Sequence, residues 1–361
     1  VDNHVETLHV GGKIKMISRH ALHSISDVRK LYTPGVAYIC RRIHDEPELM
    51  YKYTYVGDTV AIVTNGTAVL GLGDIGPRAG MPVMEGKALL FSSLAGVNGI
   101  PILIDSRDPD VIVSTVASIG HSFGAIQLED IAAPECFEIE DRLQKLMDIP
   151  VMHDDQHGTA VVVLASLINA CKYTGTMQSS ATVGIIGLGA AGIGISKLLR
   201  AYGVGKILGT DIVPEAKERL RQMVDGEPVS LDELMASADI VIATTGVPGL
   251  IKPEAVRRRQ VIFALSNPNP EIKPEQALER GAAFAADGRM VNNALAFPGL
   301  FRGALSARAH VINDAMKIAA AEAIAAEADE GDLVPMLLKE GLHQRVADRV
   351  ERCALETGAN R

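Results

Sequence analysis

The chain has 361 residues, of which 47% are hydrophobic and 22% are charged, and its formal net charge is −9. This profile is that of a globular enzyme and excludes a disordered or fibrous chain, while the acidic balance argues against nucleic acid as the ligand. The length is sufficient for two domains that each bury a core of their own.

The first residues, VDNHVETLHVGGKIK, lack the apolar run of a secretory signal, and no apolar run reaches the roughly 18 to 20 residues that a membrane span needs. A first residue of Val rather than Met fits a processed chain and a fragment equally well. The four cysteines, Cys40, Cys136, Cys171 and Cys353, form no CxxC pair or zinc spacing, which is typical of free thiols in a reducing compartment. We therefore expect a cytoplasmic protein that binds neither a membrane nor nucleic acid.

Between residues 55 and 131, three short runs rich in strand-forming residues alternate with helix-like stretches such as EGKALLFSSLAGVNG. The three runs are TVAIVT, GIPILID and GAIQLED. This alternation predicts a layer of parallel strands covered by helices. The first run is followed by TNGTAVLGLGDIGPRAGMP, which we expect to be a glycine-rich loop without a helix, because Pro77 and Pro82 interrupt it.

A second α/β unit is expected after the polar stretch TGTMQSS at residues 174–180. Its first part, TVGIIGLGAAGIGISKLLRAYGVGKILGTD, reads as strand, glycine turn, helix and strand, and further strands are expected in ADIVIATTG and QVIFALSN. Residues 301–328 are rich in alanine with larger apolar residues at helical spacing, which predicts a helical cap.

The predicted fold class is therefore α/β with two domains. Residues 1–160 are predicted to form an N-terminal α/β domain. Residues 161–361 are predicted to form a Rossmann-type dinucleotide-binding domain, with its core at about 181–297 and a C-terminal helical segment at about 301–361.

Two segments match the pattern GxGxxG, namely GLGDIG at residues 71–76 and GLGAAG at residues 187–192. A pyrophosphate site needs a buried strand, a tight turn of bare glycines and a helix whose N-terminus faces the phosphates, and we expect only the second segment to have all three. We interpret residues 71–76 as a loop that shapes the substrate pocket. The predicted cofactor-binding residues of the second segment are Gly187, Gly189, Ala190, Ala191 and Gly192.

Asp211 is expected at the end of the next strand, 22 residues beyond Gly189. A carboxylate at this position accepts hydrogen bonds from the ribose hydroxyls and repels a 2′-phosphate. The sequence thus favours NAD as the cofactor, with NADP as the alternative.

Two pairs of acidic residues follow short apolar runs: Glu129 with Asp130, and Asp154 with Asp155. Carboxylates gathered at one edge of a sheet repel one another unless a cation neutralises them, and an all-oxygen set suits Mg²⁺ or Mn²⁺. The pattern therefore predicts a site for a hard divalent metal ion.

His153 and His157 have the spacing of the two histidines in a zinc-hydrolase helix. However, Asp154 stands where that motif needs a glutamate, and we expect Gly158 to form a turn. We therefore disfavour a zinc hydrolase.

Taken together, several segments resemble the signature sequences of the malic enzymes, in the order found in the short bacterial type. They are LYTPGVA at 31–37, GLGDIGPRAGMPVMEGK at 71–87, LED at 128–130, HDDQHGTA at 153–160, the GLGAAG turn, ALSNP at 264–268 and VNNALAFPGLFRGAL at 291–305. The resemblance spans roughly residues 10–330. It implies the oxidative decarboxylation of malate to pyruvate and CO₂ with reduction of NAD or NADP, dependent on Mg²⁺ or Mn²⁺, in a homodimer.

The resemblance also implies roles for individual residues. The implied catalytic residues are Tyr32 as general acid, Lys87 as general base and Asp154 as its neighbour. The implied metal ligands are Glu129, Asp130 and Asp155, so the resemblance makes residues 1–160 the catalytic domain that binds substrate and metal. The implied substrate contacts are Asn267 and Asn293, with Asn292 beside them, and Thr245 and Asn267 are expected at the cofactor.

The larger eukaryotic-type relatives carry an arginine for the substrate carboxylate after the segment that reads TNGTAV here, whereas this chain has Ala68 at that place. We expect the metal, the asparagine amides and backbone N–H groups of residues 71–76 to bind the carboxylate instead, with Arg78 and Arg302 as further candidates. A base must have a pKa near the operating pH. Burial and a metal ion would lower the pKa of Lys87 and Asp154 would raise it, so the net direction is open.

Two other functions use the same features. A malolactic enzyme, which converts malate to lactate and CO₂ with NAD retained, would need the same segments. A non-catalytic nucleotide-binding regulator would use the glycine turn alone, but that hypothesis leaves Lys87 and the paired acids unexplained.

Overall fold

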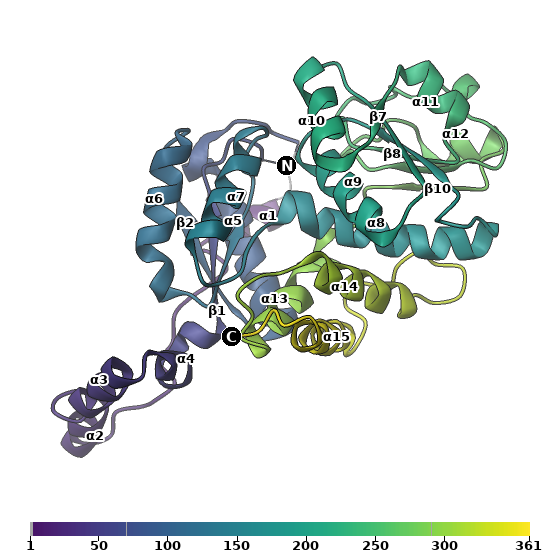
Figure 1. The fold of residues 1–361 in the computed structure, drawn as a ribbon. Helices are drawn as coiled ribbons and strands as arrows, with labels where there is room; N and C mark the ends of the chain where they lie inside the picture. The colour runs from purple at the N-terminus through teal and green to yellow at the C-terminus, as the bar shows by residue number, and fades with distance from the viewer. Residues whose placement is uncertain (1–2, 70, 290) are drawn as a thin grey trace.

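The computed structural model describes residues 3–69, 71–289 and 291–361 and contains two parallel sheets with helices around them (Figure 1). The first sheet has the order β2-β1-β3-β4, and the second has the order β10-β9-β8-β5-β6-β7. Neighbouring strands in both sheets run parallel, as the sequence predicts for an α/β protein. The strands are β1 Thr59–Thr64, β2 Asn98–Leu103, β3 Ala125–Leu128, β4 Val151–His153, β5 Thr182–Ile186, β6 Lys206–Thr210, β7 Glu227–Pro228, β8 Ile240–Ala243, β9 Val261–Ala264 and β10 Phe284–Asp287.

The expectation that no helix follows the first glycine-rich segment is wrong. Helix α5 begins at Gly76 and runs to Ala95, with Pro77 in its first turn and Pro82 inside it. A proline is compatible with the first turn because the N–H groups there have no partner within the helix. The helix also continues past Pro82, where one backbone hydrogen bond is lost.

The expected turn at Gly158 is also absent, because Gly158 lies inside helix α8, Asp154–Thr174. A Cβ atom at Gly158 would lie only 1.9 Å from Oδ1 of Asp154. The carboxylate of Asp154 therefore occupies the space in which a side chain at position 158 would lie. The glycine here serves the packing of a buried acid within a helix.

The glycine turn at 187–189 joins β5 directly to helix α9, Ala190–Tyr202. By contrast, residues 65–75 separate β1 from α5, so the first segment lacks the tight turn of a pyrophosphate site. Helix α9 packs closely on α8, because a Cβ atom at Gly194 would lie 2.4 Å from the carbonyl oxygen of Gln156. The other helices on the second sheet are α10 Pro214–Val224, α11 Leu231–Ser237 and α12 Pro274–Glu279.

The C-terminal part is helical, as predicted, with α13 Phe297–Ser306, α14 Asp314–Ala326 and α15 Leu342–Glu356. One cluster of buried apolar side chains extends from Val60 in β1 through α8 to Val183 in β5 and includes Phe297 and Phe301 of α13. The predicted division at residues 160 and 161 falls inside α8 and stays a prediction.

The remaining helices are α1 Asn3–His9, α2 Ile25–Leu31, α3 Val36–Asp45, α4 Met50–Tyr53, α6 Pro109–Ile119 and α7 Glu135–Leu146. Helices α2 and α3 stand out from the rest of the molecule beyond α4 (Figure 1). Among the described residues, no helix combines the length and apolar character needed to cross a membrane.

Candidate active site

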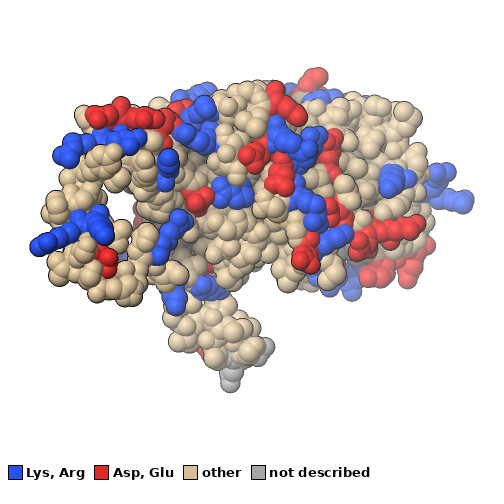
Figure 2. Space-filling model, turned by 90° about the horizontal axis from the view of Figure 1, so that it is seen from below, with Lys and Arg blue, Asp and Glu red and all other residues tan. Residues whose placement is uncertain are grey.

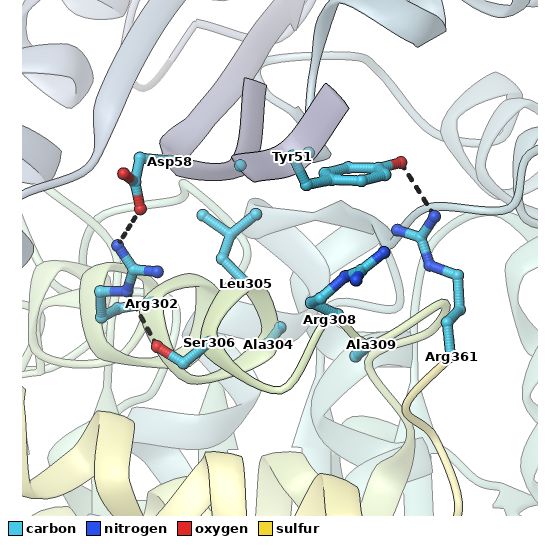
Figure 3. A pocket seen from close by; sticks show the side chains of 11 residues that line it. Tyr51, Asp58, Arg302, Ala304, Leu305, Ser306, Arg308, Ala309 and Arg361 are labelled. Atoms are coloured by element: carbon cyan, nitrogen blue, oxygen red, sulfur yellow. Dashed lines mark hydrogen bonds and ion pairs between the residues drawn. The ribbon is translucent and has the colours of Figure 1, made fainter. Parts of the chain in front are cut away.

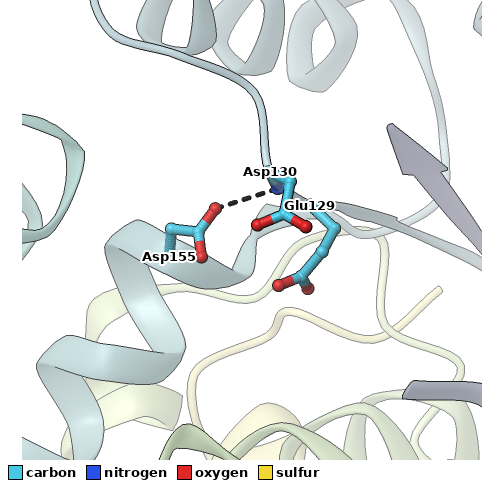
Figure 4. A group of neighbouring side chains, drawn as sticks. All are labelled: Glu129, Asp130 and Asp155. Atoms are coloured by element: carbon cyan, nitrogen blue, oxygen red, sulfur yellow. Dashed lines mark hydrogen bonds between the residues drawn. The ribbon is translucent and has the colours of Figure 1, made fainter. Parts of the chain in front are cut away.

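Three carboxylates from two neighbouring strands meet at one point (Figure 4). Glu129 and Asp130 follow β3, and Asp155 lies in the first turn of α8, directly after β4. One carboxylate oxygen from each of the three lies within 4.8 Å of the others. The backbone N–H of Asp130 donates to Oδ2 of Asp155 at 3.0 Å, from a left-handed backbone conformation with φ of 53°. The structure thus brings together the three residues that the sequence predicts as metal ligands.

Lys87 reaches the same point from helix α5. Its Nζ lies 2.5 Å from Oδ2 of Asp154 and 3.0 Å from Oε1 of Glu129. The ammonium also lies over the ring of Phe297, 4.6 Å from the centroid. Asn293 donates from Nδ2 to Oδ2 of Asp154 at 2.7 Å. Lys87, Asp154 and Asn293 therefore form one connected polar group beside the carboxylates.

Burial and the neighbouring acids set the charge of this group. Burial lowers the pKa of Lys87, but the charges of Asp154 and Glu129 outweigh it and hold that pKa above its usual range. Burial raises the pKa of Glu129, Lys87 opposes this effect, and Asp154 and Asp155 add to it. The direction that the sequence leaves open is therefore upward within the chain itself: the neighbouring acids favour the charged form of Lys87.

The three carboxylates fit a hard divalent cation. Glu129 and Asp130 are buried and Asp155 is half-buried, so their charges repel one another with little screening by water. Lys87 is shared between Glu129 and Asp154 and cannot compensate all four acids. Carboxylate oxygens alone are the donor set that Mg²⁺ and Mn²⁺ prefer. Glu129, Asp130 and Asp155 could therefore hold such an ion.

The three predicted substrate asparagines lie in different surroundings. Asn293 belongs to the polar group of Lys87, as described above. Asn292 is exposed, and its side chain accepts from the backbone N–H of Ala294, which caps a short 3₁₀ helix at Asn293–Leu295. Asn267 donates to the carbonyl of Gly288 at 3.3 Å.

The loop at residues 71–76 lies beside Asn267. A Cβ atom at Gly71 would be 3.7 Å from the carbonyl oxygen of Asn267. The main chain at Gly71, which follows the first sheet's β1, therefore lies near the residues that follow β9 of the second sheet. This proximity agrees with the interpretation of residues 71–76 as a loop that shapes a pocket.

The geometry of the second glycine segment fits a dinucleotide. A Cβ atom at Gly192 would lie 1.9 Å from the carbonyl oxygen of Gly187, and one at Gly187 would lie 2.9 Å from that of Thr244. A Cβ atom at Gly189 would meet nothing within 4 Å. Gly187 and Gly192 are therefore needed for the turn itself, whereas the surface above Gly189 is open for a ligand at the N-terminus of α9.

Asp211 and Thr245 follow the strands on either side of β5. Asp211 accepts from the backbone N–H of Leu188 at 2.7 Å and from that of Val213 at 2.9 Å. Thr245 donates from Oγ1 to Glu271 at 2.9 Å. Both residues thus line the end of the sheet at which the glycine turn lies.

Tyr32 is not brought to this site within the chain. It follows α2 as the C-terminal cap on the protruding segment, and the residue is 69% exposed. Arg302 lies elsewhere too: it donates to Asp58 at 2.8 Å and lines a small pocket with Tyr51, Arg308 and Arg361 (Figure 3).

Sequence reasoning assigned no role to two residues that shape the site. Gln127 donates to Glu129 at 2.6 Å and so orients it. The two residues are two positions apart at the end of a strand, which places them on one side, and this period could have revealed the pair. Phe297 contacts Lys87 through its ring, and no local pattern distinguishes it from an ordinary core residue.

Glu140 and His157 lie behind the first turn of α8. Glu140 accepts from the backbone N–H of His153 at 2.8 Å and from Gln156 at 3.0 Å, and it contacts His157 Nε2. Burial opposes ionisation, but His157 and the N–H of His153 together lower the pKa of Glu140 to about 2. The pair borders a separate pocket of about 670 Å³ whose walls include Lys197.

Comparisons with known proteins agree with this arrangement. A family model described as the malic enzyme N-terminal domain matches residues 12–144, and one described as the NAD-binding domain of D-isomer specific 2-hydroxyacid dehydrogenases matches residues 149–248. The chain is 57% identical to NAD-dependent malic enzyme 1 of Bacillus subtilis over 98% of this chain and 81% of that protein. It is 45% identical to the bifunctional malic/malolactic enzyme of the same organism over 97% of this chain and 92% of that protein.

Solved structures give the same result. The crystal structure of malic enzyme from Pyrococcus horikoshii matches with a TM-score of 0.91 and 40% identity, over 97% of this chain and 88% of that one. The crystal structure of NAD-dependent malic enzyme from Thermotoga maritima matches with a TM-score of 0.90 and 39% identity, over 97% of this chain and 99% of that one.

Proposed function

The chain belongs to the malic enzyme family and decarboxylates malate oxidatively to pyruvate with a nicotinamide cofactor, and we propose that the cluster around Lys87 is where it does so. The observation that carries this proposal is the meeting of Lys87 with the acids that follow β3 and β4. A lysine and several carboxylates at the carboxyl edge of a parallel sheet supply a proton acceptor, when the amine is neutral, and a cation site.

Glu129, Asp130 and Asp155 hold a divalent metal ion, Mg²⁺ or Mn²⁺, in this proposal. When bound, such an ion supplies Lewis-acid stabilisation of negative charge on oxygen. Gln127 orients Glu129, and the backbone N–H of Asp130 orients Asp155, so the carboxylates are held in place before an ion arrives.

Lys87 accepts the proton of the substrate 2-hydroxyl as hydride leaves C2 for the nicotinamide. It must be neutral to do so, and its pKa is held up by Asp154 and Glu129. A cation on the carboxylates offsets part of that effect, which moves the pKa of Lys87 toward the working range. Asp154 keeps the Lys87 side chain oriented, and Asn293 fixes Asp154 in turn.

Decarboxylation breaks the bond between C3 and C4, and the resulting enolate of pyruvate must take a proton at C3. We assign this proton to the hydroxyl of Tyr32. Asn267 and Asn293 are assigned to the substrate carboxylates, with Asn292 as the neighbour whose capping bond holds the segment. Their amides donate hydrogen bonds without adding charge.

The turn at 187–192 would hold the dinucleotide, with Gly189 at the pyrophosphate and Asp211 at the adenosine ribose. Thr245 and Asn267 lie along the same edge of the sheet, toward the nicotinamide. We assign NAD as the preferred cofactor because Asp211 carries a negative charge where NADP would place a phosphate. The division into a substrate domain at 1–160 and a nucleotide domain at 161–361, and a homodimeric assembly, complete the proposal.

The test is to incubate the purified chain with L-malate, Mn²⁺ and either NAD or NADP. Absorbance of the reduced nicotinamide is followed, and pyruvate and lactate are measured at the end. Reduced cofactor and pyruvate rising together in equal amounts support the proposal, and the faster cofactor is thereby identified. Lactate without net reduction would instead mean malolactic activity, and no product would leave only a nucleotide-binding protein.

A further inference from the structure

Glu271 lies in the loop that follows β9, and it is fully buried. On the outside of the molecule, acidic side chains lie beside basic ones, as Figure 2 shows for one face. A carboxylate in the interior lacks the water that surrounds such exposed groups, and it is costly unless hydrogen bonds satisfy its oxygens. The hydrogen-bond partners of Glu271 therefore indicate what this residue does.

Among the described residues, the hydrogen bonds to the Glu271 carboxylate come from Thr245 and Ser266. Oε1 accepts from the backbone N–H of Thr245 at 2.7 Å, from its hydroxyl at 2.9 Å and from the hydroxyl of Ser266 at 2.5 Å. Oε2 accepts from the backbone N–H of Ser266 at 3.3 Å. None of these donors is a cation. The buried acid is thus stabilised by two loops of the chain and not by an ion pair.

The two hydroxyl groups also accept hydrogen bonds, which fixes the direction of the network. The Ser266 hydroxyl accepts from the backbone N–H of Gly246 at 2.7 Å, and the Thr245 hydroxyl accepts from that of Val247 at 3.1 Å. Each hydroxyl hydrogen is therefore left to donate to Glu271. A carboxylate accepts hydrogen bonds without donating any, so it suits a position on which donors alone converge.

The loops after β8 and β9 are joined by side chains at this level. The hydrogen-bond ladder between the two strands ends where the N–H of Leu265 donates to the carbonyl of Ala243 at 2.9 Å. Within the described part of the chain, main-chain bonds between the two loops resume at Gly249, which donates to the carbonyl of Pro270 at 3.2 Å. The carboxylate of Glu271 is the centre of the network that spans the stretch between.

This network lies directly beneath residues that we assign to the cofactor and the substrate. Thr245 donates to Glu271 itself, and Asn267 follows Ser266 in the chain. Residues 246–249 and 268–269 above the network are exposed, so this edge of the sheet is open to a ligand. Glu271 is therefore one hydrogen bond away from one of the assigned residues, and one hydrogen bond and one peptide unit away from the other.

We propose that Glu271 is a positioning residue for hydride transfer. Without touching substrate or cofactor, its carboxylate fixes the loop that carries Thr245 against the loop that carries Asn267. This inference rests on the proposed roles of these two residues. Hydride transfer depends steeply on the placement of the two reacting carbons, so a small shift between the loops slows it.

The test compares Glu271→Gln with the wild type. Glutamine has the same shape, but its amide nitrogen donates where the carboxylate accepts, so the network is broken at one oxygen. We expect kcat to fall about tenfold or more, because the reacting groups are misplaced. The dissociation constant of NADH should change less than about threefold, because the glycine turn is intact. The circular dichroism of bound NADH at its own absorption band reports the nicotinamide geometry without turnover, and it should change.

The matched control is Glu275→Gln, an exposed acid in the first turn of α12, which should equal the wild type in all three measurements. Normal kcat or an unchanged dichroism signal in Glu271→Gln overturns the positioning role, and a lower melting temperature alone would then mean a purely structural residue. If this variant does not fold, Ser266→Ala removes one donor to Glu271 and gives the same measurements with the same expected changes. A wild-type chain that reduces no cofactor with malate overturns the proposed function instead, while the dichroism of bound NADH still tests the network.

Discussion

The carboxylate of Asp211 accepts the backbone N–H of Leu188 at 2.7 Å, which ties the end of β6 to the glycine turn after β5. Asp211 thus has a structural contact beside its proposed part in cofactor choice. A substitution that removes the whole side chain would confuse the two effects, whereas Asp211→Asn removes the charge and keeps one oxygen acceptor for Leu188, at the loss of the acceptor for Val213.

We expect Asp211→Asn to raise the ratio of kcat/KM for NADP over that for NAD by about tenfold, because the repulsion of a 2′-phosphate is lost. Steady-state kinetics with both cofactors measure this ratio. The exposed Asp232, in the first turn of α11, gives the control Asp232→Asn, which should leave the ratio unchanged. An unchanged ratio in Asp211→Asn would remove Asp211 from cofactor selection.

Substitution by alanine should have different effects on stability at Gly189 and at Gly192. Gly189→Ala meets no atom within 4 Å, so the melting temperature should stay the same while the dissociation constant for NAD rises. Gly192→Ala forces a methyl group against the carbonyl of Gly187 and should reduce stability by about 2 kcal/mol as well. Thermal melts and titration of NADH fluorescence separate the effects. Normal NAD affinity in Gly189→Ala would place the pyrophosphate elsewhere.

Lys87→Ala should lower kcat by about a hundredfold or more, because a general base is lost. Lys172 lies on the last turn of α8 and is exposed, so Lys172→Ala is a control that keeps full activity. NADH binding, measured alongside, shows that the variant is folded.

The pH profile tests the partner of Lys87. Burial lowers the pKa of Lys87, and Asp154 is the strongest influence that raises it. A base with a raised pKa loses its proton only at higher pH, so Asp154→Asn should move the rising limb of kcat/KM to lower pH. A limb that stays in place or moves upward would mean that another group titrates there.

Removal of the metal should abolish turnover, and Mn²⁺ or Mg²⁺ should restore it. Asp155→Asn should weaken Mn²⁺ binding at least about tenfold, because one carboxylate oxygen of the cluster is lost. Electron paramagnetic resonance of free Mn²⁺ measures this affinity without reference to activity. Asp141→Asn, an exposed acid on α7, serves as the control. Equal affinity in Asp155→Asn and the wild type would exclude Asp155 as a ligand.

Glu140 should make stability depend on acid pH. His157 and the N–H of His153, acting against burial, lower its folded pKa to about 2 from the ordinary value of 4.5. A lowered pKa adds stability above pH 4.5, and this contribution is lost as the pH falls toward 2. The difference between the folded and the ordinary pKa of Glu140 corresponds to about 3 kcal/mol of folding stability. Urea unfolding at several pH values from 4.5 down to about 2 should show a smaller loss of stability in Glu140→Gln than in the wild type.

The acid cluster could be predicted because the carboxyl ends of neighbouring parallel strands always meet. Glu129 and Asp155 follow β3 and β4, which pair directly, so the two apolar runs in the sequence were sufficient. The start of α5 was missed because the rule against proline applies to helix interiors, while Pro77 stands in the first turn. The turn expected at Gly158 was wrong because this position needs a glycine for another reason: the carboxylate of Asp154, one helical turn earlier, fills the space of a side chain.

The position of Tyr32 lies beyond sequence reasoning for a different reason. The segment LYTPGVA indicates a role for the tyrosine, but no local pattern tells where Tyr32 lies relative to Lys87. The segment that carries Tyr32 is held at its base by contacts of Tyr51 in α4 with Arg308 and Arg361, each more than 250 residues away in the sequence. Such pairings follow only from the assembled fold.

The close approach of Gly194 to the backbone of Gln156 has a consequence for the geometry of the proposed site. Gln156 directly follows the acid Asp155, and Gly194 lies two residues beyond the glycine turn, so the proposed metal ligands and the proposed cofactor turn are linked through a main-chain contact between α8 and α9. Main-chain atoms in helices have no alternative rotamers. The distance between these two parts of the proposed site therefore does not depend on side-chain rotamers at this helix crossing.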